Sequence, residues 1–284
     1  MLLRTRSALR TTCFQVVVMI AGTVPALASV DMDLVPHRAV YDMALGDADE
    51  AAGVVGVSGL IVYDFSGSAC EGYSTSFRFV TEFQAPDGGS QVTDLRNSSY
   101  EGGSGESFQF LSKTYVGEKL VESVRGSAKQ DGAVKAVSLK EPEERDFEID
   151  PKALFPTMHM KGIIEAAKAG KSFMTSDVFD GSETGDKVYA TTTVIGAGHK
   201  EPVPESDAPD AGKLALPPMN YWPVTVAYFD PAVSGEGEEM PLYQMSFLLY
   251  ENGISRKISL NYGNFTINGA MREIELHEAE PCAK

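Results

Sequence analysis

A stretch of alternating side chains at residues 73–83 constrains the fold of this chain most strongly. Its odd-numbered positions carry aromatic residues and threonine, whereas mostly polar residues fall between them. A period of two residues is typical of a β-strand with one buried face. A second β-rich run precedes it at residues 60–65, and Ser66-Gly67-Ser68 between the two runs predicts the turn of an antiparallel hairpin.

Similar strand-like runs, separated by turn residues, recur along most of the chain. The strongest hairpin signal is Asn252-Gly253, because an Asn-Gly pair favours the tight turns that match strand twist. Asn268-Gly269 predicts either another turn or a bulge. The further predicted strands are residues 35–45, 91–100, 108–116, 119–126, 133–139, 147–149, 173–179, 187–196, 221–229, 242–250, 254–262, 265–267 and 270–277.

One segment departs from the period of two. Within residues 154–171, apolar side chains recur at three- and four-residue intervals, which predicts one helix, or two with a break near Pro156, ending at Gly170. Many short strands and so little helix predict a mainly β fold, with a single large antiparallel sheet that is closed or rolled on itself. An open sheet of this many strands would leave a long edge exposed. We expect the helix to cover or plug the concave side of the sheet.

The N-terminal residues 1–28 have the pattern of a cleavable secretory signal peptide. Three arginines precede an apolar run at residues 14–21, and Ala26-Leu27-Ala28 matches a cleavage site. The apolar run is too short to cross a bilayer, so we expect export without a transmembrane anchor. Residues 29–284 are then expected to form one domain.

The composition of the mature chain restricts its partners. The formal net charge of the full sequence is −16, and loss of a basic signal peptide would make the chain more acidic still. Charge attraction to nucleic acid or to anionic lipid head groups is therefore not expected. Residues 198–218 contain five prolines and several acids, which predicts an exposed loop.

Only two cysteines, Cys70 and Cys282, remain once residues 1–28 are removed. Disulfides persist in exported proteins, so we expect these two to be bonded. The bond would fasten the end of the chain to an early hairpin. On the chain-entropy model, closing so long a loop removes at most about 5 kcal/mol of denatured-state freedom.

Motifs that carry chemistry are absent from the sequence. It contains no G-x-S-x-G, S-x-x-K or H-E-x-x-H pattern, and its four histidines, His37, His159, His199 and His277, are isolated. We therefore predict no catalytic residue, metal or cofactor. His159, on the predicted helix, is the best candidate for a catalytic base, although no partner can be assigned to it from spacing and a structural histidine is the other interpretation.

Several segments together resemble the EipB family of periplasmic cell-envelope integrity proteins of alpha-proteobacteria. The resemblance covers nearly all of the mature chain. It is carried by HRAVYDMAL from His37, the Cys70 hairpin, DLRNSSYEGGSGESFQFLSKTYV from Asp94, LFPTMHMKGIIEAAKAGK from Leu154, and the Asn-Gly hairpin through REIELHE to Cys282.

Membership in that family implies a β-spiral of about fourteen antiparallel strands with a long helix, similar to the lipoprotein carriers LolA and LolB. It also implies a Cys70–Cys282 disulfide, a periplasmic location, and a role in envelope integrity under stress with a periplasmic TPR-repeat partner. It supplies no catalytic residues. The likeness to lipoprotein carriers concerns the fold, which by itself does not establish function.

The first functional hypothesis is a non-enzymatic periplasmic protein that binds a protein or lipidated client, with a lipid or lipoprotein as the ligand. The alternatives are an envelope hydrolase that acts on peptidoglycan or lipid near His159, and a structural scaffold for a TPR-repeat partner. Each inward-facing residue can equally serve only to fill the core. The candidate binding residues of the concave face are Phe77, Phe79, Phe83, Phe108, Phe110, Phe247 and Ile258.

The predicted disulfide can be tested by thiol labelling of the denatured mature protein. Without reductant we expect no free sulfhydryl, and with reductant we expect Cys70 and Cys282 to be labelled and the melting temperature to fall. Two free thiols in the protein purified without reductant would contradict the pairing.

Overall fold

The computed structural model describes residues 34–200, 218–231 and 240–278. The predicted signal peptide at residues 1–28, most of the predicted loop at residues 198–218, and Cys282 lie outside the described residues. The pairing of Cys282 with Cys70 therefore stays a prediction.

All strands of the described residues belong to one antiparallel sheet. It has 14 strands in the order β8-β7-β6-β5-β4-β3-β2-β1-β14-β13-β12-β11-β10-β9. One α-helix, α1 (Pro156–Lys168), and one 3-10 helix (Glu50–Ala52) accompany it. The strands are β1 His37–Ala48, β2 Gly56–Ser68, β3 Gly72–Gln84, β4 Ser90–Glu101, β5 Ser107–Val116, β6 Lys119–Asp131, β7 Val134–Glu141, β8 Arg145–Ile149, β9 Phe173–Val178, β10 Tyr189–Ile195, β11 Tyr221–Phe229, β12 Tyr243–Tyr250, β13 Ser255–Asn261 and β14 Phe265–Leu276.

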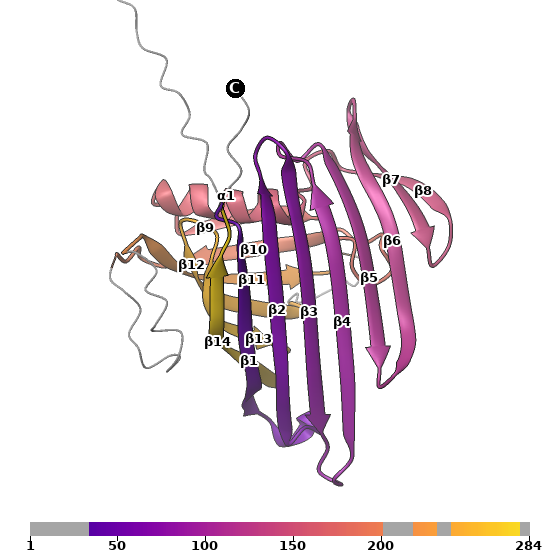
Figure 1. Cartoon of the computed structure of the whole chain (residues 1–284), viewed down its shortest axis with the longest axis vertical. Coiled ribbons are helices and arrows are strands. Elements are labelled where there is room, and N and C mark those ends of the chain that lie inside the picture. Colours follow the sequence, from indigo (N-terminus) through magenta and orange to yellow (C-terminus); the bar gives the residue numbers. More distant parts are fainter. Residues whose placement is uncertain (1–33, 201–217, 232–239, 279–284) are drawn as a thin grey trace, which may run out of the picture. The chain divides into compact units, whose positions relative to one another are not determined.

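The sheet is rolled but not closed, because β8 and β9 stand at its two ends and do not pair with each other. Figure 1 shows β1 to β8 side by side, with β9 to β13 crossing behind the first of them and α1 lying across one end. This arrangement confirms the predicted fold class of a mainly β, rolled antiparallel sheet with one helix.

The two end strands are protected in different ways. The edge strand β8 carries exposed charges at Arg145, Asp146 and Glu148, which disfavour pairing with another chain. The edge of β9 meets the segment before α1, where Leu154 N donates a hydrogen bond to Asp177 O at 2.7 Å. Both edges of the open sheet are thus protected against pairing with strands of another chain.

The structure moves the first predicted turn. Ser66, Gly67 and Ser68 are the last residues of β2 and pair with Ser74, Tyr73 and Gly72 of β3, and the turn lies at residues 69–71. Gly67 has a φ of +100°, and a Cβ there would lie 2.1 Å from Gly72 O. Glycine is therefore needed here because the two strands approach each other closely, and it does not mark the turn.

The prediction of a turn or bulge at Asn268-Gly269 was wrong. Both residues pair in register with Ala44 and Met43 of β1, and the two irregularities in this pair of strands lie between Val40 and Tyr41 and between Leu45 and Ala48. A Cβ on Gly269 would lie 2.7 Å from the sulfur of Met43. The glycine makes room for this large side chain and allows the strand to continue.

The helical segment forms a single helix that begins later than predicted. Pro156 occupies its first turn, where its missing N–H and fixed φ are tolerated. Leu154 lies outside the helix and forms a bridge with Val178. Pro156 thus starts the helix and does not break it, and Gly170, with a φ of +72°, follows its end.

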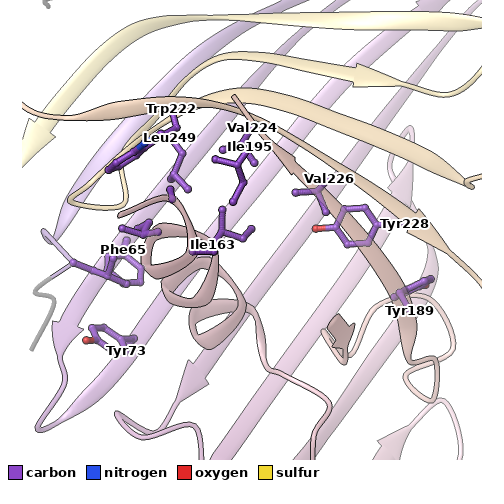
Figure 2. Close-up of a cluster of buried hydrophobic side chains, with 14 residues drawn as sticks. Phe65, Tyr73, Ile163, Tyr189, Ile195, Trp222, Val224, Val226, Tyr228 and Leu249 are labelled. Atoms are coloured by element: carbon purple, nitrogen blue, oxygen red, sulfur yellow. The ribbon is translucent and has the colours of Figure 1, made fainter. Parts of the chain in front are cut away.

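The apolar face of α1 packs against both halves of the rolled sheet. Ile163 and Ile164 share a buried cluster with Phe65 of β2 on one side and with Trp222 of β11 on the other. Figure 2 shows Ile163 between the strands that carry Phe65 and those that carry Trp222. The helix therefore ties together parts of the sheet that are far apart in strand order.

The loop after β9 makes a second connection across the roll. Phe179 packs against Phe108 and Phe110 of β5, with ring centroids 6.3 and 5.7 Å apart. Further along this loop, Asp186 accepts a hydrogen bond from Arg145 of β8. The loop that follows β9, the last strand in the sheet order, thus contacts β5 and β8 from the other end of that order.

A buried glutamate from β4 holds the start of the helix. Phe155 at the N-cap offers no side-chain hydrogen bond, but the Glu101 carboxylate accepts bonds from Thr157 N at 2.7 Å and from Met158 N at 3.0 Å. Burial nevertheless raises the pKa of Glu101, because desolvation disfavours the charged form. Glu101 supplies the cap that the helix sequence lacks.

Replacing Glu101 with alanine should therefore loosen the helix. The two backbone donors would be left buried without an acceptor, so the free energy of unfolding should fall by about 1–3 kcal/mol. Chemical denaturation of E101A and of the control E122A, which changes an exposed glutamate of β6, measures the difference. Equal stability of the two variants would show that the contact does not hold the helix.

Candidate ligand-binding cavity

A cavity of about 420 Å³ lies between α1 and the inner face of the sheet. Strand side chains alternate between the two faces, so the odd-numbered residues of β3 and β4, among them Phe77 and Asn97, point inward. From α1, His159 and Ile163 complete the wall. The cavity occurs where the three buried apolar clusters of the fold meet, since members of each line it.

Most of the cavity wall is apolar. Phe77 of β3, Phe247 of β12 and Ile258 of β13 all line the cavity, and all three are only half-buried although they belong to the inner face. Pockets of a few hundred Å³ with apolar walls and a few polar groups are typical ligand sites. The arrangement can accommodate a hydrocarbon chain.

The structure brings five of the seven predicted inward residues to this cavity. Phe77, Phe108, Phe110, Phe247 and Ile258 line it. Phe108 and Phe110 are 1% and 5% exposed, so they act mainly as the packed end wall.

The other two predicted residues, Phe79 and Phe83, do not line the cavity. They share the inner face of β3 but lie further along the strand, where they pack against the cluster built on β1, β13 and β14. Phe83 meets the ring of Phe265 edge-on at 6.2 Å. The strand is longer than the cavity, so alternation alone could not separate wall residues from core residues.

Polar groups gather at one end of the cavity. Asp180, in the loop after β9, accepts a hydrogen bond from Ser182 N at 2.9 Å, and Tyr228 of β11 lies on the same wall. Burial raises the pKa of the Asp180 carboxyl, and it also raises the pKa of Tyr228. Asn97 accepts a hydrogen bond from Ser112 at 2.7 Å on the opposite side.

Sequence reasoning missed this polar end. Residues 180–185 had only the pattern of a turn, and nothing in that pattern shows that the turn folds back against β5. The residue that allows this fold-back is Gly181. Its φ is +68°, and a Cβ there would lie 2.4 Å from the ring of Phe110.

His159 does not have the surroundings of a catalytic base. Its Nε2 lies 3.5 Å from Thr191 Oγ1, and that hydroxyl donates to Ser176 O at 2.7 Å. Burial lowers the pKa of His159 to about 4, and no charged partner offsets that effect. A catalytic base needs a shorter contact to its nucleophile and a group that orients it, so the geometry favours a structural histidine.

Of the other histidines that the structure describes, His37 and His277 lie near each other: His277 N donates a hydrogen bond to Pro36 O at 2.8 Å. Burial lowers the pKa of His37, and repulsion between the two rings adds to this effect. His37 contacts Val35 O through Nδ1 at 2.7 Å, and His199 stacks on Tyr221 at 5.3 Å. Across residues 34–200, 218–231 and 240–278, no three His, Cys, Asp or Glu side chains converge on a position for a metal ion. In the same residues, no helix has the length and apolar character needed to span a membrane.

Comparisons with known proteins agree on one family. The model of the EipB-like family matches residues 28–278. The cell envelope integrity protein EipB of Brucella abortus (strain 2308) is 40% identical over 258 residues, which cover 91% of this chain and 89% of that protein. The crystal structure of a beta-barrel-like protein of domain of unknown function DUF1849 from Brucella abortus matches with a TM-score of 0.79 and 40% identity, covering 87% of this chain and all of the other.

The buried state of His159 predicts an unusual titration. Because its pKa falls from 6.5 to about 4 on folding, the folded state binds fewer protons, and this group lowers the free energy of unfolding as the pH drops from 6.5 toward 4. NMR of the imidazole carbons, assigned with a His159→Gln variant, should show a neutral ring from pH 5.5 to 8. A midpoint at or above 6.5 would contradict this environment.

Proposed function

Because the chain belongs to the EipB-like family, we propose that it is a cell-envelope integrity protein that works by binding the apolar chain of a lipidated client. The relative in Brucella abortus is named for cell-envelope integrity, and the signal-peptide pattern at residues 1–28 supports a periplasmic location. The proposed activity is binding, without catalysis.

The observation that carries the proposal is the cavity between α1 and the sheet. Protein interiors are packed nearly as densely as organic crystals, and unfilled apolar volume costs stability in proportion to its size. A space of about 420 Å³ with half-buried Phe77, Phe247 and Ile258 on its walls is large for a defect in packing. It fits a site that a ligand occupies for part of the time.

The position of the polar groups supports binding over hydrolysis. The cavity contains a buried histidine, His159, whose contact with a hydroxyl is long at 3.5 Å, and a carboxyl, Asp180, which accepts a hydrogen bond from the backbone N–H of Ser182. These groups can orient a ligand through hydrogen bonds. They do not form the hydrogen-bonded arrangement of nucleophile, base and orienting group that acyl transfer requires.

Native mass spectrometry of protein purified from the periplasm tests the proposal. We expect a fraction of molecules to carry an additional mass that denaturation releases and that fragmentation identifies as lipid or lipopeptide. A uniform unliganded mass, with no uptake from lipid vesicles, would contradict binding. An empty cavity together with a copurifying TPR-repeat protein would favour the scaffold alternative.

A variant that fills the cavity links the ligand to this site. Ser99 of β4 lines the cavity, so Ser99→Phe should reduce the loaded fraction at least several-fold while the melting temperature stays close to that of the parent protein. The matched control is Ser76→Phe on the exposed face of β3, which should keep the parental loading. Equal loading of the two variants would place the ligand elsewhere.

A further inference from the structure

No lysine or arginine is found among the described residues that line the cavity. Among the described residues that form its wall, the ionisable groups are two histidines, one aspartate and several tyrosines. The cavity therefore has no permanent positive charge with which to pair an acidic head group. This composition differs from that of sites that bind phosphates or carboxylates, which use arginine or lysine as partners.

The two histidines of the wall do not supply a positive charge at neutral pH. Burial lowers the pKa of His37 from 6.5, and it lowers the pKa of His159 to about 4. The tyrosines are also uncharged, because burial raises the pKa of Tyr63 to about 12 and raises that of Tyr41 further. Asp180 is the remaining ionisable residue among the described residues of the wall. A carboxyl group is either neutral or negatively charged, so it cannot supply a positive charge.

Nearby cations are engaged behind the wall. The Lys135 ammonium donates to Ala153 O and lies 4.3 Å from the centre of the Phe155 ring. The Lys187 ammonium lies 2.8 Å from Asp230 and 2.6 Å from Glu183. Arg256 of β13 is 9% exposed, and its charge partly offsets the rise in the pKa of Tyr41 on the wall. None of these three cations is among the described residues that line the cavity.

Resting on the proposed function, we propose that the cavity accepts hydrocarbon chains whose head group is neutral or cationic and rejects those that end in a carboxylate or another anion, with Asp180 as the residue that sets this preference. An anionic group drawn into an apolar site without a partner loses its hydration, at a cost of several kcal/mol. The Asp180 carboxyl adds repulsion when it is ionised.

The class of ligand follows from this preference. An acyl chain linked as an ester or an amide carries no charge at its linkage, whereas a free fatty acid carries a carboxylate. Asp180, Ser182 and Tyr228 at the polar end can donate or accept hydrogen bonds with ester, amide or hydroxyl groups. Esterified or amide-linked acyl chains, from a lipid-modified protein or from a neutral lipid, are thus the expected occupants.

Displacement of a neutral fluorescent probe, N-phenyl-1-naphthylamine, from the mature protein tests this preference. The competitors share a dodecyl chain and differ in head group: dodecyl maltoside, dodecyltrimethylammonium and dodecanoate, each below its micellar concentration at pH 7.5. We expect the neutral and cationic competitors to displace the probe at concentrations at least tenfold lower than dodecanoate. Displacement by dodecanoate at the concentration of the maltoside would overturn the inference.

Two matched variants assign the preference to Asp180. Asp180→Asn should narrow the gap between dodecanoate and dodecyl maltoside at least threefold, with the gap taken as the ratio of the concentrations at which they displace the probe and normalised to the affinity of that variant for the probe. Asp177→Asn removes an exposed carboxylate of β9 and should leave the gap unchanged. Equal gaps in both variants would overturn the role of Asp180.

The outcomes separate this inference from the proposed function. If the probe and all three competitors fail to bind, or if they bind the cavity-filled Ser99→Phe variant as well as the parent protein, the proposed function fails and the inference with it. If the neutral competitor binds but the charge of the head group has no effect, only the inference fails. If the inference holds, displacement of the probe by a triacylated neutral lipopeptide is compared with displacement by a diacylglycerol of equal chain length. The stronger competitor distinguishes a lipid-modified protein from a free lipid.

Discussion

The packing of α1 across the inside of an unclosed sheet is the contact on which the rest of this structure depends. A sheet whose first and last strands do not pair has no backbone hydrogen bonds between those strands to close it, so side-chain contacts must hold it rolled. Ile163 and Ile164, which are 3% and 0% exposed, meet both Phe65 and Trp222. Each such side chain contributes about 1.5–3 kcal/mol when fully buried, and Glu101 fixes where the helix starts.

The cavity follows from how this interior is filled. The helix occupies one part of the roll, and Phe155 and Phe179 occupy another beside β5. Neither fills the space between Phe77 and Phe247, so about 420 Å³ remains where the clusters meet. Because the walls are apolar and the described lining residues include no lysine or arginine, the packing that rolls the sheet is also the basis of the proposed ligand preference.

The strands and the helix could be predicted because their signals are local. Alternation at residues 73–83 and the three- to four-residue spacing at residues 154–171 depend only on neighbours in sequence. The family resemblance added the number of strands, about fourteen, and the β-spiral architecture. The errors arose where a glycine served close packing across the chain, as Gly67 does against Gly72 and Gly269 does against Met43.

The site was less predictable than the fold because it is formed by contacts between distant segments. Alternation identified Phe77 but could not separate it from Phe79 and Phe83, since the end of the cavity is set by the other side of the roll. Asp180 and Glu101 gave no signal, because their roles depend on a loop and a helix that reach them in space. A crystal structure of the mature protein grown with dodecyl maltoside tests the central claim most directly: the account predicts the dodecyl chain between Phe77, Phe247 and Ile258, whereas a cavity closed by side chains, with the detergent bound only outside the sheet, would contradict it.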